Sequence, residues 1–289
     1  MKLPPHLALL RPHQWSKNIL VFAPAFFGHR WELASFTLSL HAALCFCLLA
    51  SSVYCFNDVL DSERDSQHKK KSTRPVASGN VAKHTALLIG TFLLALAFLW
   101  AGLLSESLSV VLAIYLLLQL VYILWAKHWV IIDVLILSST FVLRVLAGVS
   151  VTLITPSSWI ILLTWMSCLM LALGKRYSEL NQQGEQAFIT RPVLAKYPKS
   201  LLEQLVATTA MSSLLLYLLW CSETVAQGRF SSIVIYPSSA LVAYGLLRYQ
   251  LLITRKEVDE DPTLILFRDT PLRGAILLFI GYLGLALYL

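Results

Sequence analysis

The sequence has few charged residues. Asp, Glu, Lys and Arg together make up 13% of the 289 residues, and hydrophobic residues make up 57%. An average soluble domain carries about 25% charged residues, so this composition excludes a water-soluble domain, a disordered chain and a coiled coil. The apolar stretches are continuous rather than alternating, which favours transmembrane helices over a membrane β-barrel.

Several common signatures of function are also missing. The five cysteines show no CxxC or metal-ligand spacing and are interpreted as buried, reduced thiols. No GxxxxGK[ST], HExxH or GxSxG stretch occurs, and no basic stretch is interleaved with aromatic residues, so nucleic acid is not expected as a partner. Pro4, Pro5 and Pro12 interrupt the first residues, which therefore do not read as a signal peptide.

Long apolar runs account for most of the chain. A membrane-spanning helix needs about 20 mostly apolar residues, and nine runs approach that length. They are 18–29, 36–56, 84–103, 107–126, 129–151, 157–174, 201–220, 232–252 and 272–289. The first run is short and contains Pro24. The sequence therefore predicts an all-α fold, a polytopic membrane bundle of nine transmembrane helices forming a single domain, 1–289.

The basic residues are distributed unevenly between alternate loops. The loops 57–83, 175–200 and 253–271 are long and rich in Lys and Arg, whereas those at 104–106 and 152–156 are very short. Because basic loops remain in the cytoplasm, the N-terminus is predicted to be cytoplasmic and the C-terminus external, as an odd number of spans requires. Topology is one explanation of the net charge of +7, and attraction of the basic loops to anionic membrane lipid is a second one.

A cluster of acidic residues ends the second apolar run. If the helix continues through it, Asp61, Asp65 and Asp58 lie about 40°, 80° and 100° around the axis from Asn57, all on one face. Like charges at this spacing repel, whereas Mg²⁺ is held by one or two carboxylates together with substrate phosphates. We interpret Asn57, Asp58, Asp61 and Asp65 as ligands of Mg²⁺; the alternative is a solvated acidic helix end.

A basic stretch follows the acidic cluster directly. It contains Lys69, Lys70, Lys71 and Arg74, and continues as Pro75-Val76-Ala77-Ser78-Gly79. Carboxylates that bind metal, followed by cations, suit a phosphorylated substrate, because Arg binds phosphate through two hydrogen bonds and Lys supplies a mobile point charge. The alternative for the lysines alone is a patch that binds the membrane surface.

These motifs resemble those of the UbiA superfamily of intramembrane prenyltransferases. The resemblance rests on Asn57-Asp58-x-x-Asp61-x-x-x-Asp65 followed by Arg74-Pro75-Val76-Ala77-Ser78-Gly79, and it covers essentially the whole chain. It implies a UbiA-like bundle of nine helices, an Asp-rich motif that holds Mg²⁺ and diphosphate, and a central cavity open to lipid. It also implies a multi-pass protein of the bacterial inner membrane whose active site faces the cytoplasm.

Further motifs are similar to one branch of that superfamily, the decaprenyl-phosphate phosphoribosyltransferases. They are Leu10-Arg11-Pro12-His13-Gln14-Trp15-Ser16-Lys17-Asn18, Phe141 to Gly148 around Arg144, Leu173 to Leu180, and Arg268-Asp269-Thr270-Pro271-Leu272. The resemblance implies phosphoribosyl diphosphate as donor and a polyprenyl phosphate lipid as acceptor, in cell-envelope biosynthesis. It gives no information on the oligomeric state or the prenyl chain length.

The loop after the sixth run lacks aspartate. Aromatic prenyltransferases of the superfamily carry a second Asp-rich motif there, but residues 175–200 contain no Asp and offer Lys175, Arg176, Tyr177 and Glu179 instead. Two anionic substrates need more cations than an aromatic acceptor does, which favours the phosphoribosyl donor. On a helix, Lys175 and Glu179 are also spaced as an ordinary surface pair, which is the alternative for Glu179.

Arg144 lies in the middle of an apolar run. An ionised side chain there costs about 2.5–3.5 kcal/mol on insertion scales, so intramembrane charges usually line a polar cavity or pair with one another. Asp133 lies eleven residues earlier and points within about 20° of Arg144 on a regular helix. We interpret Arg144 as a site residue, with structural pairing inside the bundle as the alternative.

The resulting hypothesis is Mg²⁺-dependent transfer of 5-phosphoribosyl to a polyprenyl phosphate, with release of diphosphate. The predicted catalytic residues are Asp58, Asp61, Asp65, Arg144, Lys175 and Tyr177. The predicted substrate-binding residues are Lys17, Asn57, Lys71, Arg74, Arg144, Lys175, Arg176, Tyr177 and Glu179. The alternatives are an aromatic prenyltransferase that uses a polyprenyl diphosphate donor, and a transporter in which Arg144 and Asp133 relay charge.

Overall fold

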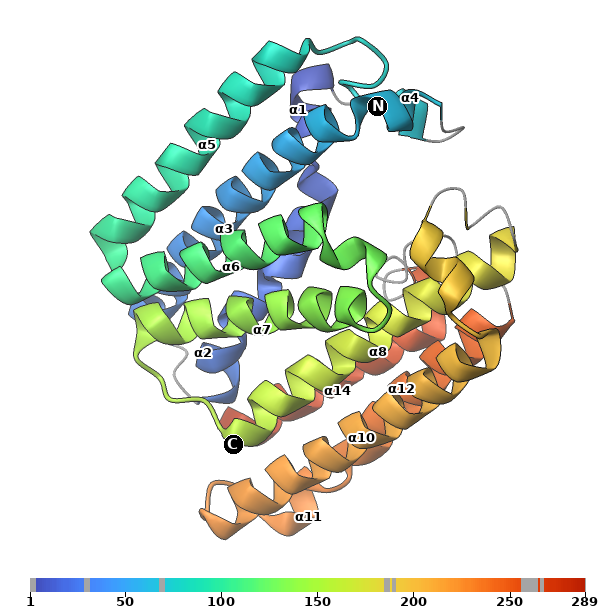
Figure 1. The fold of residues 1–289 in the computed structure, drawn as a ribbon. Helices are drawn as coiled ribbons and strands as arrows, with labels where there is room; N and C mark the ends of the chain where they lie inside the picture. The colour runs from blue at the N-terminus through green and yellow to red at the C-terminus, as the bar shows by residue number, and fades with distance from the viewer. Residues whose placement is uncertain are drawn as a thin grey trace. The chain divides into compact units, whose positions relative to one another are not determined.

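The computed structural model describes residues 4–28, 32–67, 71–184, 188, 191–255, 265 and 268–288. Within these residues the chain forms helices joined by turns and loops, and no strand (Figure 1). The backbone divides into two compact units. Unit 1 comprises Met1–Trp125 and Thr140–Pro156, and unit 2 comprises Ala126–Ser139 and Ser157–Leu289.

Unit 1 contains the N-terminal helices. They are α1 (Pro5–Leu9), the 3₁₀ helix η1 (Pro12–Phe22), α2 (Ala23–Phe27), α3 (Leu33–Leu60), α4 (Ser62–Ser66), η2 (Lys71–Thr73), α5 (Lys83–Leu104) and α6 (Glu106–Leu124). The helix α7 (Ile132–Thr152) begins in unit 2 and ends in unit 1. The longest of these, α3, packs against α5, η1 and α6.

Small side chains form the contact between α3 and α5. Ala42, Cys45, Ala97 and Ala101 are fully buried in one cluster with residues of α6 and α7. Small residues let helix backbones approach closely. Helices in a membrane associate through such close packing, because the hydrophobic effect does not drive them together there. Ser52 of α3 donates a hydrogen bond to the Gly90 carbonyl of α5 at 2.7 Å, which joins the two helices further.

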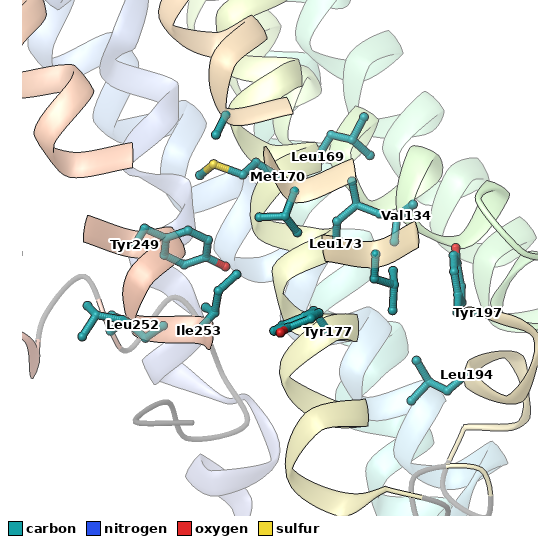
Figure 2. Packing of buried hydrophobic residues seen from close by; sticks show 14 of the residues in the cluster. Val134, Leu169, Met170, Leu173, Tyr177, Leu194, Tyr197, Tyr249, Leu252 and Ile253 are labelled. Carbon is teal, nitrogen blue, oxygen red and sulfur yellow. The ribbon is translucent and has the colours of Figure 1, made fainter. Parts of the chain in front are cut away.

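Unit 2 contains α8 (Ser158–Gln183), η4 (Pro192–Lys196), α10 (Lys199–Ala226), α11 (Ser232–Ile235), α12 (Ser238–Thr254) and α14 (Thr270–Tyr288), with η3 (Ala126–His128) before α7. Its most extensive packing is between α8 and α10. Figure 2 shows its core. The labelled members of the cluster are Val134, Leu169, Met170, Leu173, Tyr177, Leu194, Tyr197, Tyr249, Leu252 and Ile253.

The outward faces of the helices are apolar. On α5, for example, Leu88, Phe92, Leu99 and Leu103 are each exposed by 65% or more. Six helices in the described part of the chain, α3, α5, α6, α7, α8 and α10, are long and apolar enough to cross a membrane, and Thr270–Ala286 is a shorter apolar helix. The predicted all-α, multi-pass membrane protein is therefore confirmed. The number nine and the cytoplasmic N-terminus stay predictions.

Proline changes two of the expected spans. The run 18–29 is divided between the end of η1 and the short α2, whose first turn contains Pro24, so it does not form one α-helix. The run 232–252 is divided between α11 and α12 at Pro237. Proline has no N–H and its ring excludes a preceding helical turn, which explains both divisions. The expected end of the sixth run at 174 is too early, because α8 continues to Gln183.

Candidate functional site

The acidic cluster lies where α3 passes into α4. The helix α3 ends at Leu60, and Asp61 takes φ −91° and ψ 2° between the two helices. The Asp61 N–H still donates to the Asn57 carbonyl at 2.9 Å, and the Asp65 N–H to the Asp61 carbonyl at 2.8 Å. The helical turn is therefore carried through a distorted junction, so the regular helix that was the condition for placing the four side chains on one face is interrupted at Asp61.

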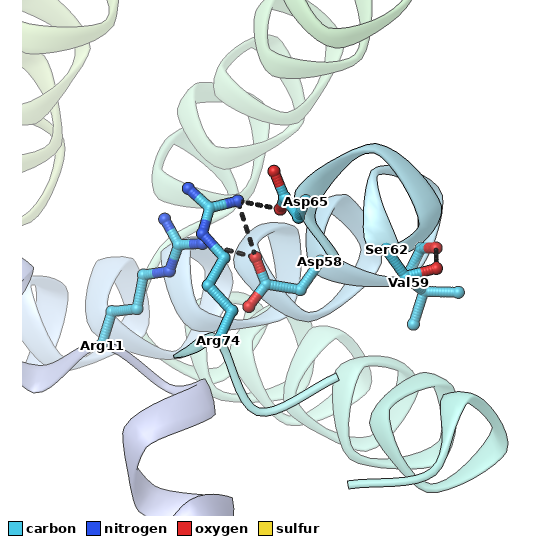
Figure 3. Close-up of polar contacts among 6 residues, drawn as sticks. All are labelled: Arg11, Asp58, Val59, Ser62, Asp65 and Arg74. Carbon is cyan, nitrogen blue, oxygen red and sulfur yellow. Dashed lines mark hydrogen bonds and ion pairs between the residues drawn. The ribbon is translucent and has the colours of Figure 1, made fainter. Parts of the chain in front are cut away.

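Two arginines bind the carboxylates of this junction (Figure 3). Arg74 Nη1 lies 2.5 Å from Asp65 Oδ2 and 3.4 Å from Asp58 Oδ1. Arg11 Nη2 also donates to Asp58 Oδ1, and its guanidinium lies 4.6 Å above the ring of Tyr54. The structure thus brings Asp58 and Asp65 together around Arg74. Arg11 is a site residue that was not predicted from the sequence, although it lies in a motif that carries the resemblance.

The two carboxylates are almost completely buried. Asp58 and Asp65 are each only 2% exposed. The second oxygen of Asp58, Oδ2, is buried and has no hydrogen-bond partner among the described residues. A buried carboxylate oxygen without a partner is costly, because it has lost its hydration without replacement. This oxygen is therefore suited to a further cation.

A tight turn presents Arg74 to the carboxylates. The Arg74 N–H donates to the Lys71 carbonyl at 2.9 Å, and the Ser78 N–H to the Arg74 carbonyl at 2.8 Å. Gly79 has φ +78°, a left-handed conformation that favours glycine. Val76 packs into a cluster with Leu9 and Cys55. The sequence Arg74-Pro75-Val76-Ala77-Ser78-Gly79 thus folds as a turn anchored on α3, with Arg74 aimed at the acidic junction.

The structure only partly assembles the predicted metal ligands. Asp58 and Asp65 share Arg74, whereas Asn57 and Asp61 are half-buried at the same junction. Within the described ranges no three His, Cys, Asp or Glu side chains are close enough to hold a metal ion. The remaining cations predicted for this unit, Lys17 and Lys71, are also half-buried. Two carboxylates suffice for Mg²⁺ when substrate phosphates complete its coordination.

A second buried charge cluster lies in unit 2. Arg176 Nε donates to Asp133 Oδ2 at 2.8 Å, and both side chains are at most 1% exposed. The Tyr197 hydroxyl donates to Asp133 Oδ1 at 2.8 Å and accepts from the Ile131 N–H at 2.6 Å. Burial raises the pKa of Tyr197, and the negative charge of Asp133 raises it further, so the hydroxyl remains protonated and can donate.

The segment Leu173 to Leu180 occupies the last turns of α8. Gly174 allows the buried Tyr249 side chain to pack closely against α8, since a Cβ at position 174 would lie 2.2 Å from the Tyr249 hydroxyl. Glu179 Oε2 lies 3.4 Å from both Arg176 Nη1 and Arg191 Nε. Tyr177 is 4% exposed, and Lys199 Nζ lies 5.8 Å from its ring centre. Arg176 is therefore bound to Asp133 and Glu179, whereas Lys175 is half-buried on the same helix.

Arg144 lies inside the helices of unit 1 and is 4% exposed. It donates to Asn18 Oδ1, the Thr140 carbonyl and the Tyr115 hydroxyl. Asp133, which the sequence placed on the same face of α7, pairs instead with Arg176 of unit 2. Asn18 was not selected from the sequence, because an amide in an apolar run carries no recognisable signal until its partner is known.

Comparisons with known proteins agree on one protein family. The model of the UbiA prenyltransferase family matches residues 19–269. The decaprenyl-phosphate phosphoribosyltransferase of Mycolicibacterium smegmatis is 30% identical over 292 residues, covering 96% of this chain and 91% of that protein. The protein of the same name from Mycobacterium tuberculosis is 30% identical over 288 residues, covering 96% and 92%.

The fold is also similar to that of solved structures. A UbiA homolog from Archaeoglobus fulgidus bound to GPP and Mg²⁺ superimposes with a TM-score of 0.73 and 21% identity, covering 99% of this chain and 100% of that chain. The digeranylgeranylglyceryl phosphate synthase structure gives a TM-score of 0.65 at 17% identity, covering 99% and 98%. At these identities the likeness concerns the fold alone.

Proposed function

Because the chain belongs to the UbiA prenyltransferase family and is therefore a membrane-embedded transferase, we propose that it transfers a 5-phosphoribosyl group to a polyprenyl phosphate. The donor in this proposal is phosphoribosyl diphosphate, and the second product is diphosphate. The names of the relatives that cover nearly the whole chain support the choice of reaction. Family membership also favours an enzyme over the transporter alternative.

One observation carries the assignment of the donor site. Asp58 and Asp65 are buried at the end of a membrane-spanning helix, bridged by Arg74, and Asp58 keeps an unpartnered oxygen. Buried carboxylates beside cations suit a ligand that brings its own cation and its own anion, as a metal diphosphate does. Arg74 and Arg11 would then exchange carboxylate oxygens for phosphate oxygens, which guanidinium groups bind equally well.

Asp58 and Asp65 would hold the metal, with Asn57 and Asp61 as further ligands from the same junction. Mg²⁺ suits this oxygen donor set and, when bound, neutralises charge that develops on the leaving diphosphate. Lys17, Lys71 and Arg74 of unit 1 would bind phosphate groups of the substrates. The assignments of Lys175, Tyr177 and Glu179 in unit 2 to substrate binding stay predictions.

The chemistry needs no strong general base. An oxygen of the acceptor phosphate is already ionised at neutral pH and forms a bond to the anomeric carbon of the ribose. The bond between that carbon and the diphosphate oxygen breaks, and the diphosphate leaves with the electron pair. The protein must therefore mainly hold the two anions close together and exclude water, which would otherwise compete as nucleophile.

We further propose that the whole chain, 1–289, acts as a single domain in the bacterial inner membrane. The excess of Lys and Arg in the loops 57–83 and 175–200 supports a cytoplasmic position for the acidic junction and the end of α8 in this proposal. A soluble sugar diphosphate would reach them from the cytoplasm. The lipid acceptor would come from the membrane.

A membrane assay tests this function. Membranes containing the protein are supplied with Mg²⁺, labelled phosphoribosyl diphosphate and a polyprenyl phosphate, and label is followed into the organic phase. We expect metal-dependent transfer, and we expect Asp65→Asn to lose at least about 100-fold in rate because it removes one buried anion without changing shape. Glu63→Gln is the matched control, since Glu63 lies in the same short helix with its side chain 90% exposed.

Two results would contradict the proposal. Full activity of Asp65→Asn would show that the carboxylate pair of Asp58 and Asp65 does not form the donor site. Consumption of a polyprenyl diphosphate with an aromatic acceptor, together with no transfer from phosphoribosyl diphosphate, would assign the chain to the aromatic prenyltransferases instead.

A further inference from the structure

Arg144 has no carboxylate partner in the part of the chain that the structure describes. Its Nε donates to Asn18 Oδ1 at 2.8 Å, its Nη1 to the Thr140 carbonyl at 2.6 Å, and its Nη2 lies 3.4 Å from the Tyr115 hydroxyl. The guanidinium carbon lies 5.6, 5.1 and 5.0 Å from the ring centres of Phe46, Tyr115 and Phe141. The charge is thus stabilised by neutral acceptors and aromatic faces of unit 1.

The partner of Arg144 belongs to the N-terminal 3₁₀ helix. Asn18 is 2% exposed in η1, and its Nδ2 donates to Cys47 Sγ of α3 at 3.1 Å. One turn along α7 from Arg144, a Cβ on Gly148 would lie only 2.0 Å from the Val21 carbonyl oxygen. The η1 helix therefore contacts α7 at two places about one turn apart, and these contacts fix its register on α7.

The beginning of η1 is connected to the acidic junction. Trp15 Nε1 donates to Ser51 Oγ at 3.1 Å, and Ser51 Oγ donates to the Leu10 carbonyl at 2.9 Å. Arg11, immediately before η1, contacts Asp58. A shift of η1 along α7 would move Arg11 with it. The position of the guanidinium on Asp58 therefore depends on the register that Asn18 and Arg144 fix.

We propose that Arg144 is a positioning residue, which acts through Asn18 to hold η1 in register and so keeps Arg11 at Asp58. In this proposal Arg144 does not contact a substrate anion. The kinetic part of its test rests on the proposed function, whereas its structural part does not.

Two substitutions of Asn18 separate positioning from anion binding. Asn18→Asp keeps the oxygen that accepts from Arg144 and adds a negative charge beside the guanidinium. Asn18→Leu keeps the branching and the number of side-chain heavy atoms but accepts no hydrogen bond. A positioning pair tolerates the first change and is broken by the second. An anion-binding arginine is neutralised by the first change and left positively charged by the second.

The first measurement is hydrogen exchange of the backbone of residues 12–22 in lipid nanodiscs. With Asn18→Leu we expect exchange of this segment to rise about tenfold, the factor that corresponds to one lost buried hydrogen bond. With Asn18→Asp we expect exchange to stay within about twofold of the wild type. Peptides from α10, in unit 2, report whether the fold as a whole is retained.

The second measurement is the transfer rate with phosphoribosyl diphosphate and a polyprenyl phosphate. We expect Asn18→Leu to lower kcat/KM about tenfold or more, and Asn18→Asp to keep most of the activity. Should Asn18→Leu fail to accumulate in the membrane, Asn18→Ala removes the same acceptor with less steric disturbance and takes its place.

The proposal would be overturned if Asn18→Asp lost more transfer activity than Asn18→Leu. If Asn18→Asp raises the KM of an anionic substrate while Asn18→Leu is active, Arg144 binds that substrate. Unchanged exchange of residues 12–22 in Asn18→Leu would also overturn it. If the wild type shows no transfer at all, the proposed function fails, but the exchange measurement still decides whether Asn18 and Arg144 hold η1.

Discussion

At the scale of single residues, burial distinguishes the arginines of this protein. Arg74 has 25% of its side chain exposed beside two carboxylates, so it can turn toward a ligand. Arg176 is 1% exposed and is held by Asp133. From the sequence both are predicted to bind substrate, because charge and position along the chain do not reveal burial. The geometry favours a supporting role for Arg176.

Replacing Arg176 by methionine is expected to destabilise the protein strongly. The substitution leaves Asp133 buried without its cation, and breaking a buried pair in this way costs about 3–5 kcal/mol. The double variant Arg176→Met with Asp133→Leu removes both charges and is expected to recover most of that loss. Equilibrium unfolding in mixed detergent micelles measures the free energies of unfolding of both variants.

Lys83→Met serves as the comparison for this pair. Lys83 and its partner Glu63 have side chains that are 55% and 90% exposed, and exposed pairs contribute about 0–1 kcal/mol. A double variant no more stable than Arg176→Met would show that Arg176 and Asp133 do not act as a pair.

At the scale of the helices, Asp269 connects two elements of unit 2. Its carboxylate accepts from Arg248 of α12 at 3.2 and 2.9 Å, and its Oδ1 also accepts from the Leu272 N–H at the start of α14 at 2.8 Å. The hydrogen bonds from Arg248, with the one from Leu272, hold the pKa of Asp269 below its usual range. This contact gives the motif Arg268-Asp269-Thr270-Pro271-Leu272 a structural role.

The lowered pKa predicts a pH-dependent contribution to stability. Because the folded-state pKa lies below the unfolded value, ionised Asp269 stabilises the fold at any pH above about 4. That contribution is lost as the pH falls through the folded-state pKa. Asp269→Asn keeps an oxygen for the Leu272 N–H but removes the charge. Its free energy of unfolding should fall by about 0.5–1 kcal/mol at pH 7, the range for a partly exposed ion pair.

The measurement compares wild type and Asp269→Asn in detergent between pH 8 and pH 3. We expect a constant difference in the free energy of unfolding down to about pH 5, followed by convergence in more acidic buffer. A difference that persists unchanged at pH 3 would mean that the charge of Asp269 is not its cause. Glu63→Gln is again the control on an exposed carboxylate.

The sequence predicted helices well where apolar length alone decides. The runs at 36–56, 84–103 and 107–126 correspond to α3, α5 and α6 with small changes at the ends. The prediction of helices was less successful where segments far apart in the sequence contact each other. Nothing in the pattern indicates that the segment 12–22 takes a 3₁₀ form, and its close approach to Gly148 becomes apparent only in the folded chain.

The candidate site was predictable to a similar degree. Asp58, Asp65 and Arg74 were found because acids and cations are rare beside apolar runs, and the structure joins them. Arg11 and Asn18 were missed. Their roles depend on Asp58 and Arg144, which lie 47 and 126 residues away along the chain, and no local spacing encodes such pairs.

At the scale of the whole molecule, the distribution of charge predicts how the chain lies in the membrane. All five cysteines are buried, so the native protein gives little background in labelling with a membrane-impermeant thiol reagent. Gln67, after α4, and Gln227, after α10, are both exposed, so we expect a single cysteine at either position to leave the packing unchanged. Cysteines at these two positions can therefore report which side of the membrane each loop faces.

The positive-inside distribution predicts opposite labelling of these two positions. Gln67 belongs to the basic loop 57–83, which is expected in the cytoplasm, and five predicted spans, an odd number, separate it from Gln227. Gln67→Cys should therefore be labelled in inverted vesicles but not in intact cells with a permeable outer envelope, and Gln227→Cys should show the reverse. Labelling of both from one side would contradict the predicted spans between them. Labelling of Gln67→Cys in intact cells and Gln227→Cys in inverted vesicles would keep the odd number but invert the orientation, and would move the acidic junction to the side without soluble sugar phosphates.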